Sequence, residues 1–131
     1  MNYLIDTSAY SLAYRGEEKT VHFFQAAERL GISPVALGEL RNGFLIGTKR
    51  EANEAALQRF LSEHRVQAMT IDEETSFFYA QVKAATRKEG MTVAPNDLWI
   101  AAGAMQHGLC ILTADTDFLK IPQVMVELVT L

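Results

Sequence analysis

Short apolar runs alternate with longer segments of helical periodicity from one end of this chain to the other. Each run has the length and composition of a buried strand, and the segments between the runs place apolar residues on one face of a helix. Strands that alternate with helices form a mostly parallel sheet with helices on both faces. The sequence therefore predicts a three-layer α/β/α fold whose strands are residues 3–5, 32–33, 66–71, 109–113 and 124–129.

The predicted helices begin and end at residues that favour those positions. Pro34 suits the first turn of a helix, and Asp72 is a typical N-cap. Gly90 favours the left-handed turn that ends many helices. By the same rule, Gly31 predicts the end of a helix that has Leu30 on its apolar face. The expected helices span residues 18–30, 34–47, 49–64, 72–89 and 95–108.

The composition is that of an ordinary globular domain, with 49% hydrophobic and 21% charged residues. No repeat, linker or low-complexity segment divides the sequence, so a single domain over residues 1–131 is expected. No apolar run approaches the roughly 18 residues that span a bilayer. The chain enters its first predicted strand without a leader-like basic and apolar segment, so we expect a cytoplasmic protein with no membrane contact.

The charge balance excludes one class of function. The formal net charge of −4 argues against a protein that coats nucleic acid, because such proteins use excess Lys and Arg to displace counterions. An acidic nuclease remains open, since bound divalent cations would reverse the local field at its site.

Acidic residues stand at the ends of strands and the starts of helices. Asp6 directly follows the first predicted strand, and Asp115 closely follows the strand at 109–113. Active sites in parallel sheets lie at the carboxyl ends of the strands, so these two carboxylates are expected at the same edge. Glu39 lies one turn into a predicted helix and Asp97 opens another, where the helix dipole favours negative charge. Each acid alone also fits a cap, a turn or a surface charge, but together they predict one carboxylate cluster.

Such a cluster predicts a divalent cation. Converging carboxylates repel one another, and some would take up protons unless a cation offset their charge. Oxygen ligands suit Mg²⁺ or Mn²⁺ better than zinc. Zinc is further disfavoured because the histidines, His22, His64 and His107, show no close ligand spacing with one another or with Cys110. Cys110 is the only cysteine, and its apolar neighbours predict a buried small residue.

Around these acids, the chain closely resembles the PIN-domain family and, within it, the VapC-type toxins of bacterial toxin–antitoxin pairs. The resemblance covers essentially the whole chain and implies a PIN-like fold with a mostly parallel central sheet. It lies in the order and spacing of four motifs, which are YLIDTS at residues 3–8, SPVALGEL at 33–40, PNDLWIAA at 95–102 and LTADTDF at 112–118.

The resemblance also implies the site residues. Many relatives have Asn where Asp115 stands and keep the Asp before Phe118, so Asp115 and Asp117 could share or exchange roles. The catalytic and metal-binding residues that it implies are Asp6, Glu39, Asp97 and Asp115. The supporting residues that it implies are Thr7 and Thr113 as hydroxyl neighbours of carboxylates or water, Asn96 as a polar support beside Asp97, and Asp117 as a flanking acid.

The implied activity is that of a Mg²⁺-dependent endoribonuclease toxin, in which Mn²⁺ can substitute. One or two metal ions would activate water and neutralise charge on an RNA phosphate, and a carboxylate such as Asp97 would accept the proton. Hydrolysis would leave a 5′-phosphate and a 3′-hydroxyl. The implied partners are RNA, a VapB-type antitoxin whose tail lies across the site, and a second copy of the chain in a homodimer. The sequence does not indicate which RNA is cut.

Other interpretations fit less of the sequence. A phosphatase of the haloacid dehalogenase type has a second catalytic Asp two residues after the first, but Ser8 stands at that position. A response-regulator receiver needs a phosphoacceptor Asp after a central strand and an acidic pair near the start. Asp72 is the only midchain candidate, and that acidic pair is missing. A PIN-like module that binds RNA or protein without cleaving it is the remaining alternative, although a pure binder has little reason to keep four mutually repelling acids.

Overall fold

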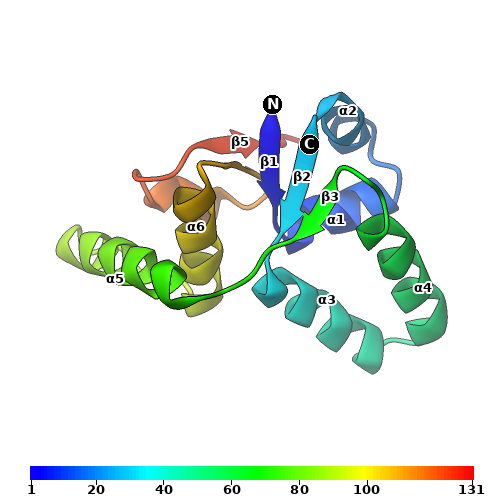
Figure 1. Cartoon of the computed structure of the whole chain (residues 1–131), viewed down its shortest axis with the longest axis horizontal. Helices are drawn as coiled ribbons and strands as arrows, with labels where there is room; N and C mark the ends of the chain where they lie inside the picture. Colours follow the sequence, from blue (N-terminus) through cyan, green and yellow to red (C-terminus); the bar gives the residue numbers. More distant parts are fainter.

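The computed structural model describes residues 1–131, in which strands and helices alternate (Figure 1). The strands are β1 (Asn2–Ile5), β2 (Arg29–Ile32), β3 (Val66–Ala68), β4 (Cys110–Thr113) and β5 (Val126–Leu128). The helices are α1 (Thr7–Tyr14), α2 (Glu18–Ala26), α3 (Pro34–Ile46), α4 (Arg50–Leu61), α5 (Glu73–Lys88), α6 (Pro95–His107) and the short 3₁₀ helix η1 (Thr116–Lys120).

The strands form one parallel sheet in the order β3-β2-β1-β4-β5. β1 is central, and its last residue, Ile5, lies opposite Ile32 of β2 and Leu112 of β4. The chain moves from β1 outward to β3 and then returns to the other side of β1 for β4 and β5. Right-handed crossovers therefore place α1 to α4 on one face and α5 and α6 on the other, as Figure 1 shows. The predicted three-layer α/β/α fold is confirmed.

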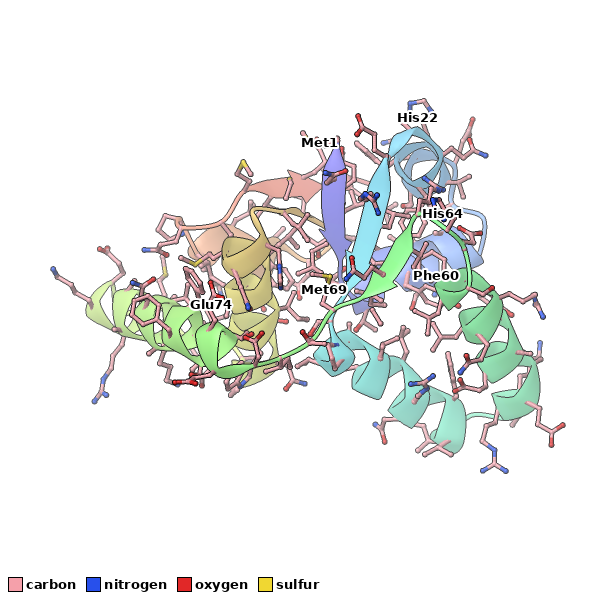
Figure 2. The ribbon with its side chains drawn as sticks, in the orientation of Figure 1. Met1, His22, Phe60, His64, Met69 and Glu74 are labelled. Atoms are coloured by element: carbon pink, nitrogen blue, oxygen red, sulfur yellow. The ribbon has the colours of Figure 1, made fainter.

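The core lies on both faces of the central strands. Leu4 and Ile5 of β1 are fully buried, which requires covering layers on both sides because successive strand residues point to opposite faces. On the α4 side, Phe60 packs edge-on against Tyr10 of α1 and also contacts Phe24 of α2 (Figure 2). Cys110 is buried, as predicted.

The prediction that a helix extends through residue 30 and stops at Gly31 is wrong. α2 ends at Ala26, and both Leu30 and Gly31 belong to β2. Packing around Gly31 is tight, since a Cβ at this position would lie 3.0 Å from the sulfur of Met69, which would have to shift to admit it. Met69 directly follows β3, and Figure 2 labels it at that end of the strand. The glycine that suggested a helix end therefore marks a crowded place in the sheet.

Other boundaries differ by a few residues, and two helices, α1 and η1, were not predicted. α4 begins and ends inside the expected range 49–64, and β3 is shorter than 66–71. α1 was not expected, although its N-cap residue, Asp6, was recognised as a possible cap. α5 and α6 each end one residue before the expected 89 and 108, and Gly90 and Gly108 have the positive φ values, 70° and 63°, that are typical of residues after a helix. No helix has both the length and the apolar character required to cross a bilayer.

Candidate metal site

The fold brings the carboxyl ends of β1 and β4 side by side at the centre of the sheet. This is the position where the strand order reverses direction, and such positions open a crevice in parallel α/β sheets. Asp6 directly follows β1 and is the N-cap of α1. Thr113 is the last residue of β4, and Asp115 is the N-cap of η1. α3 and α6 contact each other at this edge. Glu39 of α3 and Asp97 of α6 therefore lie near Asp6 and Asp115.

Asp6 is buried, with 5% of its surface exposed, and its carboxylate accepts hydrogen bonds from three groups. The backbone N–H of Ala9 donates to Oδ1 at 2.9 Å, which caps α1. The Ser8 hydroxyl lies 2.8 Å from Oδ1 and 3.0 Å from Oδ2. The Thr113 hydroxyl donates to Oδ2 at 2.6 Å. These contacts fix the orientation of the carboxylate without any positively charged side chain.

Glu39 is held at both of its carboxylate oxygens. The Thr7 hydroxyl donates to Oε1 at 2.7 Å, and the Asn96 amide donates to Oε2 at 3.2 Å. The two donors come from the first turn of α1 and the first turn of α6, so the carboxylate links three helices that meet at this edge. The sequence suggested that Asn96 would support Asp97, but the hydrogen bond of its amide goes to Glu39.

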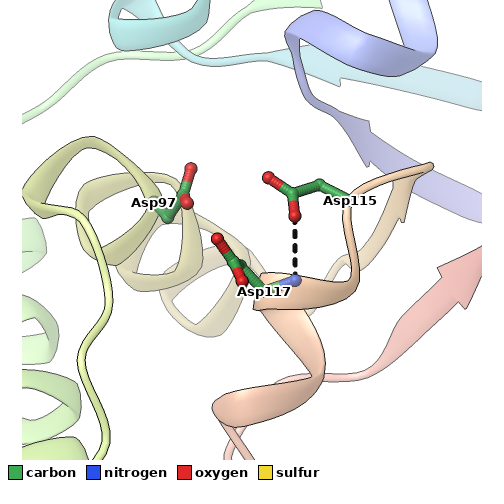
Figure 3. Close-up of side chains that lie close together, drawn as sticks. All are labelled: Asp97, Asp115 and Asp117. Atoms are coloured by element: carbon green, nitrogen blue, oxygen red, sulfur yellow. Dashed lines mark hydrogen bonds between the residues drawn. The ribbon is translucent and has the colours of Figure 1, made fainter.

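Asp97, Asp115 and Asp117 form a cluster in which one oxygen of each carboxylate lies within 4.8 Å of the others. Figure 3 shows the side chain of Asp97 reaching from α6 toward the two acids at the start of η1. The backbone of η1 fixes the Asp115 carboxylate, because Oδ1 of Asp115 accepts a hydrogen bond from the backbone N–H of Asp117 at 2.9 Å. All three side chains are half-buried, so water and a small ion can reach them.

The cluster carries more negative charge than its surroundings offset. Burial, followed by repulsion from Asp115 and Glu39, raises the pKa of Asp97 from 3.8 to about 6. Repulsion from Asp117 and Asp6 adds to the same shift. Burial also raises the pKa of Asp6, although the hydrogen bonds from Thr113, Ala9 and Ser8 partly oppose the increase. The cluster is therefore an environment in which an added cation relieves repulsion.

The predicted acids do not all meet at one point. Asp97 and Asp115 share the cluster with Asp117, whereas Asp6 and Glu39 lie outside this 4.8 Å group. Both outlying acids are still close enough for their charges to raise the pKa of Asp97. Asp115 and Asp117 both contribute to the cluster, so the two alternatives for the fourth acid remain open.

Two neighbours of the acids were not identified as site residues from the sequence. Ser8 contacts Asp6, and its position two residues after this acid was the only available signal. Lys120 lies one 3₁₀ turn after Asp117, and its ammonium is 3.0 Å from the Asp117 Oδ1. The same ammonium is 3.4 Å from the carbonyl oxygen of Thr92, so it ties the start of η1 to the loop before α6.

The donor set fits a hard divalent cation. Carboxylate oxygens from separate elements are the ligands that Mg²⁺ and Mn²⁺ prefer, and neither a histidine nor the single cysteine belongs to the cluster. Burial and the charges of the neighbouring acids all raise the pKa of Asp97, so this carboxylate has no positive partner that lowers it. Lys120 pairs with Asp117 and also contacts the carbonyl oxygen of Thr92, so it offsets only part of the charge of the cluster.

Comparisons with known proteins point to one family. The sequence model described as "PIN domain" matches residues 3–124. The ribonuclease VapC4 of Mycobacterium tuberculosis is 39% identical over 101 residues, which are 77% of this chain and 76% of that protein. A solved structure of VapBC2 from Rickettsia felis matches with a TM-score of 0.86 and 24% identity over 99% of this chain and 100% of that one. A solved structure of DNA-bound VapBC from Salmonella typhimurium matches with a TM-score of 0.82 and 26% identity over 97% of each chain.

Proposed function

Because the chain belongs to the PIN-domain family and, within it, to the VapC-type ribonuclease toxins, we propose that it is a Mg²⁺-dependent endoribonuclease of a toxin–antitoxin pair. Its substrate is RNA, and it hydrolyses phosphodiester bonds. The observation that carries the metal-dependent mechanism is the cluster of Asp97, Asp115 and Asp117, in which repulsion and burial raise the pKa of Asp97 to about 6. The likeness to VapC4 of M. tuberculosis, a protein named a ribonuclease, supports the activity.

The residues proposed to hold the metal are Asp6, Glu39, Asp97 and Asp115, with Asp117 as a flanking acid or an alternative ligand. Mn²⁺ can replace Mg²⁺, because both prefer oxygen ligands. When bound, the ion neutralises charge on the phosphate and makes water a better nucleophile.

The chain itself contributes fixed carboxylates and a proton acceptor. Thr7 and Asn96 hold Glu39, while Ser8 and Thr113 hold Asp6, so neither acid has to reorganise when substrate arrives. Asp97 accepts the proton of the attacking water, since its pKa is raised to about 6 and a base works best near the operating pH. The water oxygen bonds to phosphorus, the bond between phosphorus and O3′ breaks, and O3′ takes a proton from solvent, which gives a 5′-phosphate and a 3′-hydroxyl.

Cleavage of RNA by purified protein tests this function. The parent is expected to cut RNA with Mg²⁺ or Mn²⁺ and to stop when EDTA is added. Asp6→Asn and Asp97→Asn are expected to lower the cleavage rate by about 100-fold or more while the circular dichroism spectrum stays unchanged. Glu39→Gln is expected to lower the rate in the same way. Glu28→Gln is its matched control, because Glu28 is exposed and its only charge partner is the chain terminus 3.9 Å away.

The same experiment separates the nuclease from its main alternative, a PIN-like module that binds RNA or protein without cutting. If the parent binds RNA but no metal ion supports cleavage, the binding module is the better description. If Asp6→Asn and Asp97→Asn both cut RNA at the parent rate, the four-carboxylate site is assigned to the wrong residues.

The proposed protein partner is a VapB-type antitoxin. The structurally similar Salmonella assembly is a DNA-bound VapBC complex, which supports this assignment. A hollow between α1, α3 and α4 offers apolar and aromatic side chains to such a partner, including Tyr10, Tyr14, Leu40 and Phe44. Co-expression with the product of the gene immediately upstream tests the pair, and the expected result is a stable complex that no longer cuts RNA.

We further propose that residues 1–131 form a single PIN domain and that the free protein is a homodimer. Sedimentation velocity distinguishes the 14.6 kDa monomer from a dimer of twice that mass.

A further inference from the structure

The hydroxyl of Ser8 joins two parts of the site that are far apart in the sequence. Ser8 is the second residue of α1, and its Oγ donates to the Asp6 carboxylate. The same oxygen accepts the backbone N–H of Ala114 at 3.0 Å, from the turn that follows β4. One side chain thus connects the acid at the end of β1 with the segment that leads to Asp115.

Thr113 makes the corresponding pair of contacts from the other strand. Its Oγ1 donates to Asp6 at 2.6 Å and accepts the backbone N–H of Asp115 at 2.9 Å. The two hydroxyl oxygens lie 3.3 Å apart. Asp6 is therefore attached to the β4–η1 turn at two successive backbone amides, those of Ala114 and Asp115.

These donors leave Asp6 little freedom to bind anything else. A carboxylate has roughly four acceptor positions, and Ala9, Ser8 and Thr113 each supply one donor. About one position is left, so Asp6 can offer a single oxygen to a metal ion. Without the Ser8 hydroxyl, Asp6 would gain a second free position, and the Ala114 amide would lose its acceptor.

We propose that Ser8 is a positioning residue of the nuclease. Its hydroxyl orients Asp6 so that a single carboxylate oxygen is free to bind the metal ion. The same hydroxyl fixes the β4–η1 turn, and thus the distance of Asp115 and Asp117 from Asp6. This inference rests on the proposed function and adds to it a residue that does not touch the substrate. Its physical basis is that a hydrogen bond to a ligand sets the orientation of that ligand.

Three variants test the inference. Ser8→Ala removes the hydroxyl, and Ser8→Thr keeps it. Ser11→Ala is the matched control, because Ser11 is a half-buried serine on the same helix and none of the side-chain hydrogen bonds in the structure involves it. The measurements are kcat and KM for RNA cleavage, and the affinity of RNA-free protein for Mn²⁺ by calorimetry.

Ser8→Ala is expected to lower kcat and Mn²⁺ affinity by about 10- to 100-fold, with little change in the KM for RNA. Ser8→Thr and Ser11→Ala are expected to stay near the parent values. The inference is overturned if Ser8→Ala keeps the parent kcat and Mn²⁺ affinity, or if Ser11→Ala loses as much as Ser8→Ala, since an equal loss indicates a general effect on α1.

Amide hydrogen exchange tests the link to the turn without metal or RNA. The Ala114 amide is expected to exchange faster in Ser8→Ala than in the parent or in Ser8→Thr. The Asp6 amide, which donates to Leu112 across the sheet, is expected to keep its rate. If the parent cuts no RNA, the proposed function fails, and Mn²⁺ affinity together with Ala114 exchange still decides the role of Ser8. An unchanged Ala114 rate contradicts the link.

Discussion

At the scale of single residues, the raised pKa of Asp97 predicts how the stability of the metal-free protein depends on pH. Its folded pKa of about 6 lies above the unfolded value of 3.8, so the folded state binds more protons between these limits. This tighter proton binding by Asp97 adds to the free energy of unfolding. The addition is fully present below the unfolded pKa and is lost as the pH rises through about 6. Asp6 acts in the same direction, because its pKa is also raised.

Metal-free protein is therefore expected to be more stable at pH 5 than at pH 7.5, by about 1 kcal/mol after allowing for water that screens the half-exposed Asp97. Urea unfolding at the two pH values in EDTA measures the difference, and Asp97→Asn is expected to reduce it. The comparison does not extend below pH 5, because acids with lowered pKa values, such as Glu54 and Asp72, lose their stabilising contacts at lower pH. Equal pH dependence in parent and variant would refute the argument.

The residues of the site differ in how far the sequence could predict them. Asp6 and Asp115 stood out because polar residues that follow buried strands of a parallel sheet share one edge. The contact between Asn96 and Glu39 could not be predicted, since it depends on where α3 and α6 cross and on the rotamers of both side chains. Ser8 was hidden for the same reason, because its partner Ala114 is 106 residues away.

At the scale of elements, the sequence predicted what local chemistry determines. Pro34 and Asp72 mark the starts of α3 and α5, where a fixed φ or a capping side chain acts within a few residues. Gly31 was misread because a glycine can serve either a helix end or a crowded strand. The contacts of Gly31 with Leu4 of β1 and with Met69, which follows β3, decide between these uses, and those contacts are set by the tertiary structure.

Two glycines, Gly43 and Gly108, are expected to respond in opposite ways to replacement by alanine, because one lies inside a helix and the other ends a helix in the left-handed conformation. A Cβ would meet no atom within 4 Å at Gly43, inside α3, or at Gly108, which ends α6 with a φ of 63°. Gly43→Ala is expected to stabilise the protein by about 0.5–1 kcal/mol, because alanine reduces the entropy lost on folding. Gly108→Ala is expected to destabilise it by about 1 kcal/mol, because the left-handed conformation is strained for alanine. Urea unfolding measures both changes, and a shift of the same sign in both variants would contradict the reasoning.

At the scale of the whole molecule, the strand order of the sheet explains why acids that are far apart in the sequence lie close enough to repel one another. β1 and β4 are neighbours only because the chain returns across the sheet after β3 and then covers the opposite face with α5 and α6. This return places Asp6 beside Thr113 and brings the N-terminus of α6 to the same edge. The fold therefore concentrates negative charge where its own hydrogen bonds cannot neutralise it, and part of the stability of the domain depends on what binds there.

A divalent cation is accordingly expected to stabilise the folded chain. An ion that binds only the folded state at 100 times its Kd adds about 2.7 kcal/mol, which corresponds to a rise in Tm of roughly 10 °C for a chain of this size. Thermal unfolding in MgCl₂, compared with NaCl at equal ionic strength, measures the rise. The effect is expected to shrink at pH 5, where protons compete for Asp97, and to disappear in Asp97→Asn combined with Asp115→Asn. The double variant without metal is expected to melt above the metal-free parent at pH 7.5, because its repulsion has been removed. An equal Mg²⁺ shift in the parent and the double variant would mean that the ion binds elsewhere, and the cluster would then have no role in holding it.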